Sequence, residues 1–316
     1  MQCIILPSGD PFFNLATDEF LLRNSSGEYL ILSINERSVI IGKHQLPHRE
    51  TDTRFVTGHE IPVIRRISGG GTVFHDPGNL NFSFILNSTE GKQVDFRKYT
   101  APVISFLASL GIDARLEGKN DLKVGGLKIS GNAEHVFRNR VLHHGTLLFN
   151  ADLHFLGKCI RQDTSVYETR AVNSNPSPVT NLCGMLGSVR DTRHFRDLML
   201  DWFLRNYPGT MVSTLSDTEV RLIGELAGNR YRNWEWNFAY GPPYIFRNQF
   251  RYGDTEAGCE ISVKNGIISD CRISGHPDLE QAGLRLRGCR HMISDVREIL
   301  GKEGIFNRGF DVFNLF

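Results

Sequence analysis

The chain has 316 residues, with 36 basic and 35 acidic side chains and a formal net charge of +1. This balance excludes the overall attraction to nucleic acid or anionic lipid that a strongly basic protein has. Hydrophobic residues make up 40% of the chain, enough for a sizeable core in one large domain or in a large and a small one. No run approaches the roughly 20 apolar residues of a membrane span, and the N-terminus lacks a signal-peptide core. We therefore expect a cytoplasmic protein that does not bind membranes.

The predicted elements begin with a helix that has Asp10 as its N-cap and Pro11 at its first position. Strand-like runs follow at 29–33, 38–41, 61–64 and 80–86. Helical spacing returns at 101–110, where Gly111 is suited to end the helix. We expect strands at 122–124, 127–130 and 141–149 around a Gly125-Gly126 turn. Helices are predicted at 195–206 and from a capping box at 216–219 to near Gly228.

The composition near 233–243 predicts a domain boundary, because the glycine and paired prolines there favour an extended connector. Beyond it, alternating apolar residues lead into Asn265-Gly266, a strong hairpin turn. Short helices are expected at 278–286 and 294–300. We therefore predict a catalytic domain at 1–236 and a small α+β accessory domain at 237–316.

Six cysteines are scattered along the chain without a Cys-x-x-Cys pair. This pattern predicts reduced, mostly buried thiols and neither a structural zinc site nor a disulfide framework. The cysteines are Cys3, Cys159, Cys183, Cys259, Cys271 and Cys289.

A glycine-rich segment, Arg65-Arg66-Ile67-Ser68-Gly69-Gly70-Gly71-Thr72-Val73-Phe74-His75-Asp76, lies between two strand-like runs. Consecutive glycines let the backbone approach a ligand, and their N–H groups can form an anion-binding nest. The alternative for a bare glycine triplet is a flexible hairpin tip. Because strand-forming residues follow the glycines, the segment is neither a Walker A motif nor a Rossmann fingerprint. Adjacent arginines on a strand point to opposite faces, so we expect Arg66 to contact phosphate and Arg65 to support it.

Two further segments carry candidate chemistry. Residues 120–133 hold Asp121, a carboxylate that could bind magnesium or accept a hydrogen bond from a nucleobase amine or a lysine nucleophile. They also hold Lys128, a point charge that could stabilise a transferring phosphoryl or acyl group. Taken alone, a lysine such as Lys128 is more often a solvated surface residue than a ligand contact. His143 and His144 are adjacent on a predicted strand and cannot form a two-histidine metal site by themselves. We expect one of them to be packed in the core and the other to face a pocket.

Four motifs in this order resemble the lipoate-protein ligase A family: Arg-Arg-x-Ser-Gly-Gly-Gly-x-Val-Phe-His-Asp-x-Gly-Asn, Asn-Asp-Leu, Lys-Ile-Ser-Gly-x-Ala and His-His-Gly-Thr-Leu-Leu. The likeness extends to 12–19, 39–45, 177–182 and 234–237, and so covers nearly the whole chain. Two departures stand out. Leu46-Pro47-His48 replaces the usual Asn-Pro-Trp of the family, and 172–176 looks like an insertion.

The resemblance implies a biotin/lipoate ligase fold, with a mixed β-sheet flanked by helices and a small accessory domain. It implies that ATP and lipoate react, with Mg²⁺, to give lipoyl-AMP and pyrophosphate. A lysine of a lipoyl domain in a 2-oxoacid dehydrogenase E2 subunit, or of glycine-cleavage H protein, would then take the lipoyl group. A monomer is the simplest expectation.

The same resemblance assigns roles to individual residues. Lys128 would contact both lipoate and nucleotide, and Asp121 would bind the adenylate or the metal. The remaining candidates for nucleotide contact or pocket lining are Arg66, Gly70, Gly71, Thr72, Val73, Phe74, His75, Asn79, His144 and Gly145.

Three alternatives remain open from the sequence. The first is an octanoyl or lipoyl transferase that works through a cysteine thioester, for which Cys159 is the candidate. The second is a biotin ligase, which the form of the glycine-rich motif disfavours. The third is a lipoyl-domain binding protein that has lost the chemistry.

Overall fold

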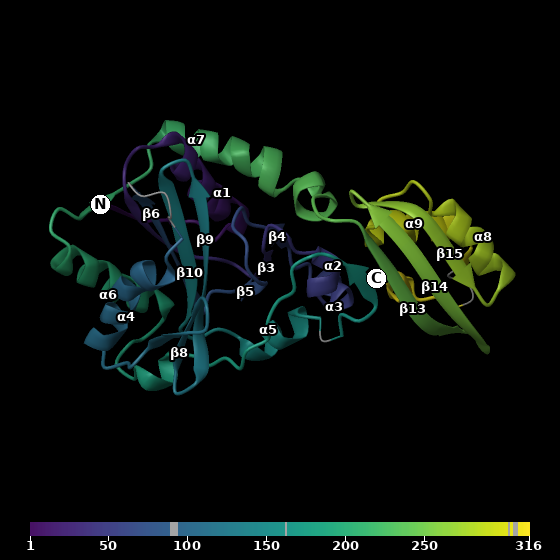
Figure 1. Cartoon of the computed structure of the whole chain (residues 1–316), viewed down its shortest axis with the longest axis horizontal. Helices are drawn as coiled ribbons and strands as arrows, with labels where there is room; N and C mark the ends of the chain where they lie inside the picture. The colour runs from purple at the N-terminus through teal and green to yellow at the C-terminus, as the bar shows by residue number, and fades with distance from the viewer. Residues whose placement is uncertain (89–93, 162, 303, 306–308) are drawn as a thin grey trace. The chain divides into compact units, whose positions relative to one another are not determined.

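The computed structural model of the chain describes residues 1–88, 94–161, 163–302, 304–305 and 309–316 (Figure 1). The chain divides into two compact units. Unit 1 comprises Met1–Lys43, Pro62–Gly157 and Ser174–Asn233, and unit 2 comprises His44–Ile61, Lys158–Asn173 and Trp234–Phe316. Two internal segments thus belong with the C-terminal residues, while the domain boundary after residue 236 stays a prediction.

Unit 1 is built on a mixed sheet of eight strands. The β12–β1 and β1–β2 pairs are parallel and the remaining pairs are antiparallel. In spatial order the strands are β12 (Met211–Ser213), β1 (Gln2–Ile5), β2 (Tyr29–Ile34), β6 (Asn79–Asn87), β10 (Arg140–Leu148), β9 (Leu127–Phe137), β8 (Asp121–Val124) and β7 (Arg115–Glu117). A second, small sheet places β3 (Ser38–Ile41) between β4 (Val63–Arg65) and β5 (Val73–His75), and so joins the two ends of the glycine-rich segment.

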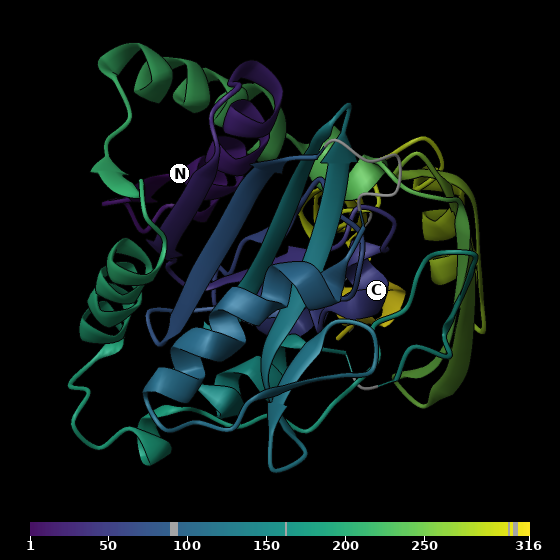
Figure 2. The same cartoon turned by 60° about the vertical axis from the view of Figure 1, so that its left-hand side comes forward.

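Helices cover both faces of the large sheet, which confirms the predicted architecture. Phe106 of α4 and Phe203 of α6 pack in one core with Phe82 and Phe84 of β6, and α4 runs across this face in Figure 2. On the opposite face, the Ser83 hydroxyl of β6 donates a hydrogen bond to Asp18 of α1. The helices and turns that begin in unit 1 are α1 (Pro11–Asn24), α4 (Phe96–Ser109), α5 (Leu153–Cys159), η1 (Cys183–Met185), α6 (Thr192–Asn206), α7 (Asp217–Leu226) and the π-helical turn η2 (Ala227–Tyr231). No helix among the described residues is long and apolar enough to cross a bilayer.

Local sequence signals placed several element ends correctly. Asp10 caps α1 by accepting from the Phe12 amide, and Ser216 and Glu219 form the expected capping box of α7. The prediction that the central helix begins at residue 101 was wrong, because α4 begins at Phe96 behind an Asp95 cap. Pro102 lies inside the helix.

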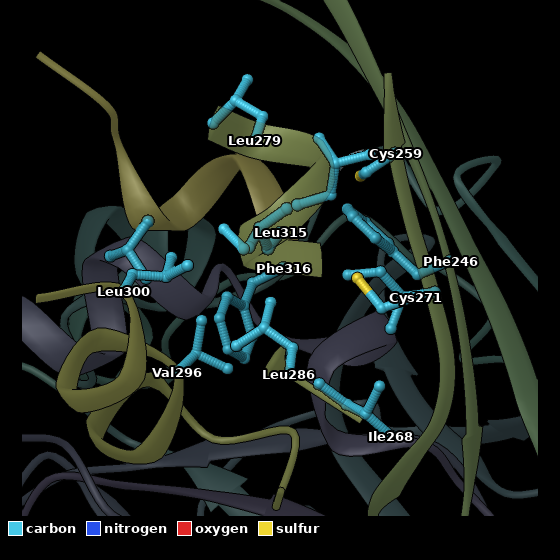
Figure 3. Close-up of a cluster of buried hydrophobic side chains, with 14 of the residues drawn as sticks. Phe246, Cys259, Ile268, Cys271, Leu279, Leu286, Val296, Leu300, Leu315 and Phe316 are labelled. Carbon is cyan, nitrogen blue, oxygen red and sulfur yellow. The ribbon is translucent and has the colours of Figure 1, made fainter. Parts of the chain in front are cut away.

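Unit 2 contains a four-stranded antiparallel sheet with helices, as an α+β unit should. Its strands in spatial order are β11 (Tyr167–Thr169), β13 (Tyr244–Tyr252), β14 (Thr255–Lys264) and β15 (Ile267–Ser274). Its helices are α2 (Pro47–Glu50), α3 (Thr53–Gly58), the π-helical turn η3 (Glu235–Ala239), α8 (Pro277–Arg285), α9 (Ile293–Lys302) and the 3₁₀ turn η5 (Val312–Leu315). The core gathers Phe246 and Cys271 from the sheet, Leu279 and Val296 from the helices, and the chain end at Phe316 (Figure 3).

Two buried histidines tie the early and late segments of unit 2 together. His48 Nε2 donates to the His291 carbonyl at 2.8 Å, and His291 Nε2 donates to the Leu315 carbonyl at 2.7 Å. The Tyr244 hydroxyl donates to His291 Nδ1 at 2.6 Å. Burial lowers the pKa of His48 to about 3 and that of His291 to about 4, so both rings are neutral in the folded protein.

These histidines should make the protein less stable in acid. The unfolded chain takes up protons on them near pH 6.5, whereas the folded chain does not until about pH 4 to 3. The free energy of unfolding should therefore fall, as the pH drops from 6.5 toward 4, by about 1.4 kcal/mol per pH unit for each histidine. Urea unfolding at pH 7.5, 6.0 and 5.0 measures this, with a His48→Asn variant losing part of the slope. A pH-independent unfolding free energy over that range contradicts the assignment.

Candidate functional site

Several functional candidates lie on one face of the large sheet, where side chains are small or polar. In cross-strand register, Asn81 of β6 lies opposite Thr146 of β10, and Ser83 lies opposite His144. His144 in turn lies opposite Ala133 of β9. The opposite face carries the aromatic core instead, because residues alternate between the two faces along each strand.

Lys128 and Asp121 meet at the edge of this polar face. Asp121 of β8 pairs in register with Gly131 of β9, and Lys128 Nζ lies 2.8 Å from Asp121 Oδ1. A Cβ added at Gly131 would lie 3.2 Å from Lys128 Nζ and 3.9 Å from Val73 Cγ1. Lys128 therefore folds back over Gly131, next to the strand that follows the glycine loop. Both charged side chains are 21% exposed, so the pair is partly accessible to solvent.

Arg66 is buried under the glycine loop and binds its backbone carbonyls. Its guanidinium donates to the carbonyls of Ile40, Gly69 and Gly71, with distances of 3.1, 2.6 and 2.7 Å. Burial lowers the pKa of Arg66 to about 10, which leaves it protonated at neutral pH. Because these carbonyls point toward Arg66, the guanidinium fixes the conformation of the loop.

Arg65 holds the turn that follows β3, beside the start of the loop. Its side chain is fully buried and donates to the carbonyls of Gly42 and Lys43 at 3.2 and 2.9 Å. The Lys43 amide donates to the Ser68 carbonyl at 2.8 Å. The turn after β3 and the start of the loop are thus held together by Arg65 and by this backbone bond.

A chain of hydrogen bonds runs from Arg66 to helix α1. Arg66 Nε donates to Ser68 Oγ at 3.0 Å, and Ser68 Oγ lies 2.6 Å from His144 Nε2. His144 Nδ1 lies 3.2 Å from Asp18 Oδ2. With Asp18 as the accepting carboxylate, Nδ1 carries the proton and Nε2 accepts from Ser68. Sequence reasoning missed Asp18 and Ser68 as site residues, although both lie inside the motifs it quoted.

The other histidines confirm the expectation of one packed ring. His143 is fully buried, its Nδ1 lies 2.9 Å from Glu134 Oε1, and burial lowers its pKa. His75 is buried as well, with Nδ1 2.9 Å from Asn35 Nδ2, and burial lowers its pKa to about 3. His75 therefore lies behind the loop as a neutral, packed ring.

The remaining candidates differ in what they contact. Asn79 is buried and donates to Asn81 Oδ1 at 2.8 Å. Gly145 leaves no room for a side chain, since an added Cβ would lie 2.3 Å from Asn132 Oδ1. Phe74 is buried next to Phe155, with ring centroids 5.7 Å apart. Gly70 is exposed at a φ of 86°, a left-handed conformation that favours glycine.

Thr72 and Gly71 meet a segment that sequence reasoning left without a role. The Thr72 amide donates to Ser174 Oγ at 2.9 Å, and a Cβ at Gly71 would lie 3.5 Å from Ser174 Cβ. Ser174 belongs to the insertion-like stretch at 172–176.

The thiols offer little to a cysteine mechanism. Cys159 is fully buried, and Cys183 donates to Asn150 Oδ1 at 3.3 Å. Over the part of the chain that the structure describes, no three His, Cys, Asp or Glu side chains are grouped to hold a metal ion.

The fold agrees with comparisons to known proteins. Residues 10–204 match the family model described as the lipoyl protein ligase A/B catalytic domain. Lipoate–protein ligase 1 of Staphylococcus aureus is 34% identical over 314 residues, covering 96% of this chain and 94% of that protein. The chain therefore belongs to the lipoyl protein ligase A/B family, and the site described above lies within the matched region.

Solved structures of lipoate-protein ligases share the fold of this chain. Lipoate-protein ligase A bound with ATP aligns with a TM-score of 0.64 and 27% identity, over 75% of this chain and 97% of that one. A lipoate protein ligase of T. acidophilum with bound lipoic acid aligns with a TM-score of 0.63 and 27% identity, over 75% and 98%. A bi-partite lipoate protein ligase from Thermoplasma acidophilum, studied with its E2 lipoyl domain, aligns with a TM-score of 0.63 and 26% identity, over 75% and 95%.

Proposed function

We propose that this protein is an ATP-dependent lipoate–protein ligase. It activates lipoate to lipoyl-AMP with release of pyrophosphate, then transfers the lipoyl group to a lysine of an acceptor protein. The observation that carries the proposal is the Lys128–Asp121 pair, held over Gly131 next to the strand that follows the glycine loop. Membership of the family and the ATP and lipoic acid bound by its structural relatives support both substrates.

In the first half-reaction the lipoate carboxylate attacks the α-phosphate of ATP, and the bond to pyrophosphate breaks. The phosphate gains negative charge that fixed donors must stabilise. Lys128 Nζ supplies a cation, and the amides of the loop from Gly70 to Phe74 supply backbone donors. Arg66 contributes by holding the carbonyls of Gly69 and Gly71 inward.

In the second half-reaction the acceptor lysine amine attacks the acyl carbonyl of lipoyl-AMP, and AMP leaves with the electron pair of the broken bond. Lys128 polarises that carbonyl or stabilises the leaving phosphate. We propose lipoyl domains of 2-oxoacid dehydrogenase E2 subunits and glycine-cleavage H protein as acceptors, a choice that the relative with its E2 lipoyl domain supports. A cytoplasmic monomer remains the expectation for the enzyme.

Magnesium fits this site as a companion of the nucleotide. Mg²⁺ is usually held by one or two carboxylates together with substrate phosphates and water. Asp121 is the carboxylate available for this beside Lys128. Mg²⁺ bound there would neutralise phosphate charge, while Lys128 keeps its own contact with the acyl-phosphate.

The test is ATP–pyrophosphate exchange measured with lipoate, octanoate or biotin as the acid. We expect exchange that depends on lipoate and persists in a Cys159→Ala variant. Exchange that biotin alone supports, or that is absent while ATP still binds, refutes the ligase assignment. Loss of transfer in Cys159→Ala points instead to the thioester alternative.

A further inference from the structure

The segment Ser174–Thr180, called the strap below, touches both halves of the candidate site. At one end, Ser174 Oγ accepts from the Thr72 amide at 2.9 Å. At the other end, the Lys128 amide donates to the Pro178 carbonyl and the Thr180 amide donates to the Lys128 carbonyl, each at 2.9 Å. The strap therefore connects the glycine loop with the backbone of the proposed catalytic lysine.

The two ends of the strap are held differently. The Lys128 end is a pair of backbone bonds on either side of Val179, which forms a parallel bridge with Lys128. The loop end is held through a serine side chain, and Asn175 and Pro176 beside it are exposed. A hydroxyl on an exposed stretch is released more easily than a backbone pair, so the loop end is where the strap can open.

The Ser174 hydroxyl occupies a donor that a nucleotide would use. The Thr72 amide belongs to the loop whose N–H groups are the proposed donors to the nucleotide phosphates. Ser174 Oγ offers this amide an oxygen at hydrogen-bond distance, as a nucleotide oxygen would. One N–H cannot serve both acceptors at full strength, so strap and nucleotide compete.

We propose that Ser174 is a built-in competitor that sets the affinity of the glycine loop for ATP. Binding of the nucleotide displaces the Ser174 hydroxyl from the Thr72 amide and frees the loop end of the strap. The Lys128 end stays paired. This inference rests on the proposed function, because it takes ATP to be the ligand of the loop.

Removal of the hydroxyl is the first test. A Ser174→Ala variant should bind ATP about 3- to 10-fold more tightly, the size of effect that the net contribution of one hydrogen bond implies. Ser174→Thr keeps the hydroxyl and should retain the wild-type Kd. Ser177→Ala makes the same change elsewhere in the strap, away from the contact with the glycine loop, and should also retain the wild-type Kd for ATP. Calorimetric titration with ATP gives the three values, and unchanged or weaker binding by Ser174→Ala overturns the proposal.

A reversible lock is the second test. The Cβ position of Gly71 lies 3.5 Å from Ser174 Cβ, within the range that a disulfide spans. The oxidised Gly71→Cys, Ser174→Cys double variant should lose ATP affinity by at least about 10-fold relative to its own reduced form. Each single cysteine variant controls for the effect of the substitution. Equal ATP binding by the oxidised and reduced double variant contradicts the competition.

These outcomes separate this inference from the ligase assignment. A wild-type protein that shows no ATP binding at all fails the assignment itself. If the protein binds ATP and catalyses lipoate-dependent exchange, the ligase assignment stands. If, in that protein, neither Ser174→Ala nor the disulfide changes the Kd for ATP, the competitor role of Ser174 is refuted.

Discussion

Replacing Lys128 with alanine should lower lipoate-dependent ATP–pyrophosphate exchange by roughly 100-fold or more. The change removes the cation that lies 2.8 Å from Asp121 Oδ1 and leaves only the loop amides to stabilise the charge on the transferring phosphate. Losing one preorganised electrostatic contact of this kind typically costs about 10²–10³ in rate. The loss should appear mainly as a lower maximal rate of exchange. Initial rates at saturating ATP and lipoate measure this maximal rate.

Lys123 provides a matched control for this change. It lies on the neighbouring strand β8, in register with Lys128, but its Nζ is 3.4 Å from Glu117 Oε2. Lys123→Ala removes a cation from the same hairpin but leaves the Lys128–Asp121 pair in place, so exchange should stay within about 2-fold, because a partly solvated ion pair contributes little. Similar losses in both variants would mean that the hairpin, and not Lys128, is what the reaction needs.

Replacing Gly42 with alanine should disable the glycine loop from outside the motif. A Cβ at this position would lie 2.1 Å from the Gly70 carbonyl oxygen, a backbone atom that cannot rotate away. The loop must shift, and with it the contacts of Arg65 to the Gly42 and Lys43 carbonyls. We expect the KM for ATP to rise at least about 10-fold and the free energy of unfolding to fall by about 1–3 kcal/mol.

Gly157 supplies the control, since an added Cβ there meets no atom within 4 Å. It lies in helix α5, where alanine is preferred to glycine, so Gly157→Ala should match or slightly exceed the wild type in stability. Steady-state kinetics with ATP varied and urea unfolding compare the two variants. A Gly42→Ala enzyme with the wild-type KM for ATP shows that the loop tolerates the displacement.

Local features of the fold could be predicted because their causes lie within a few residues. Asn265 and Gly266 adopt φ angles of 51° and 71°, which their hairpin motif demands, and Gly125 and Gly126 behave likewise at 56° and 80°. The spatial order of the strands in the large sheet could not be predicted. Parallel pairing of β1 with β12, for example, joins Cys3 to Val212, and no local pattern indicates that distance in sequence.

The candidate site shows the same division. Glycine spacing and paired strands indicated the loop, and the motifs around Asp121 and Lys128 indicated the charged pair. The contact of His144 with both Ser68 and Asp18 could not be foreseen, because it depends on strand register and on where α1 crosses the sheet. No sequence signal indicated that His44–Ile61 and Lys158–Asn173 belong to unit 2, since both segments lie inside what looked like a continuous catalytic domain.

The bond from His48 to His291 has a consequence for synthesis of the protein. Its partners are separated by 243 residues, so the segment around His48 emerges from the ribosome long before its core exists. At 5–20 residues per second, that segment waits on the order of 10–50 s with apolar side chains such as Leu46 uncovered. Strands β3 and β4, which flank it, can pair meanwhile and hold it as a loop. During that interval the exposed apolar side chains of the nascent chain can bind a chaperone. Codon changes that slow translation of the last third of the chain should therefore increase its aggregation.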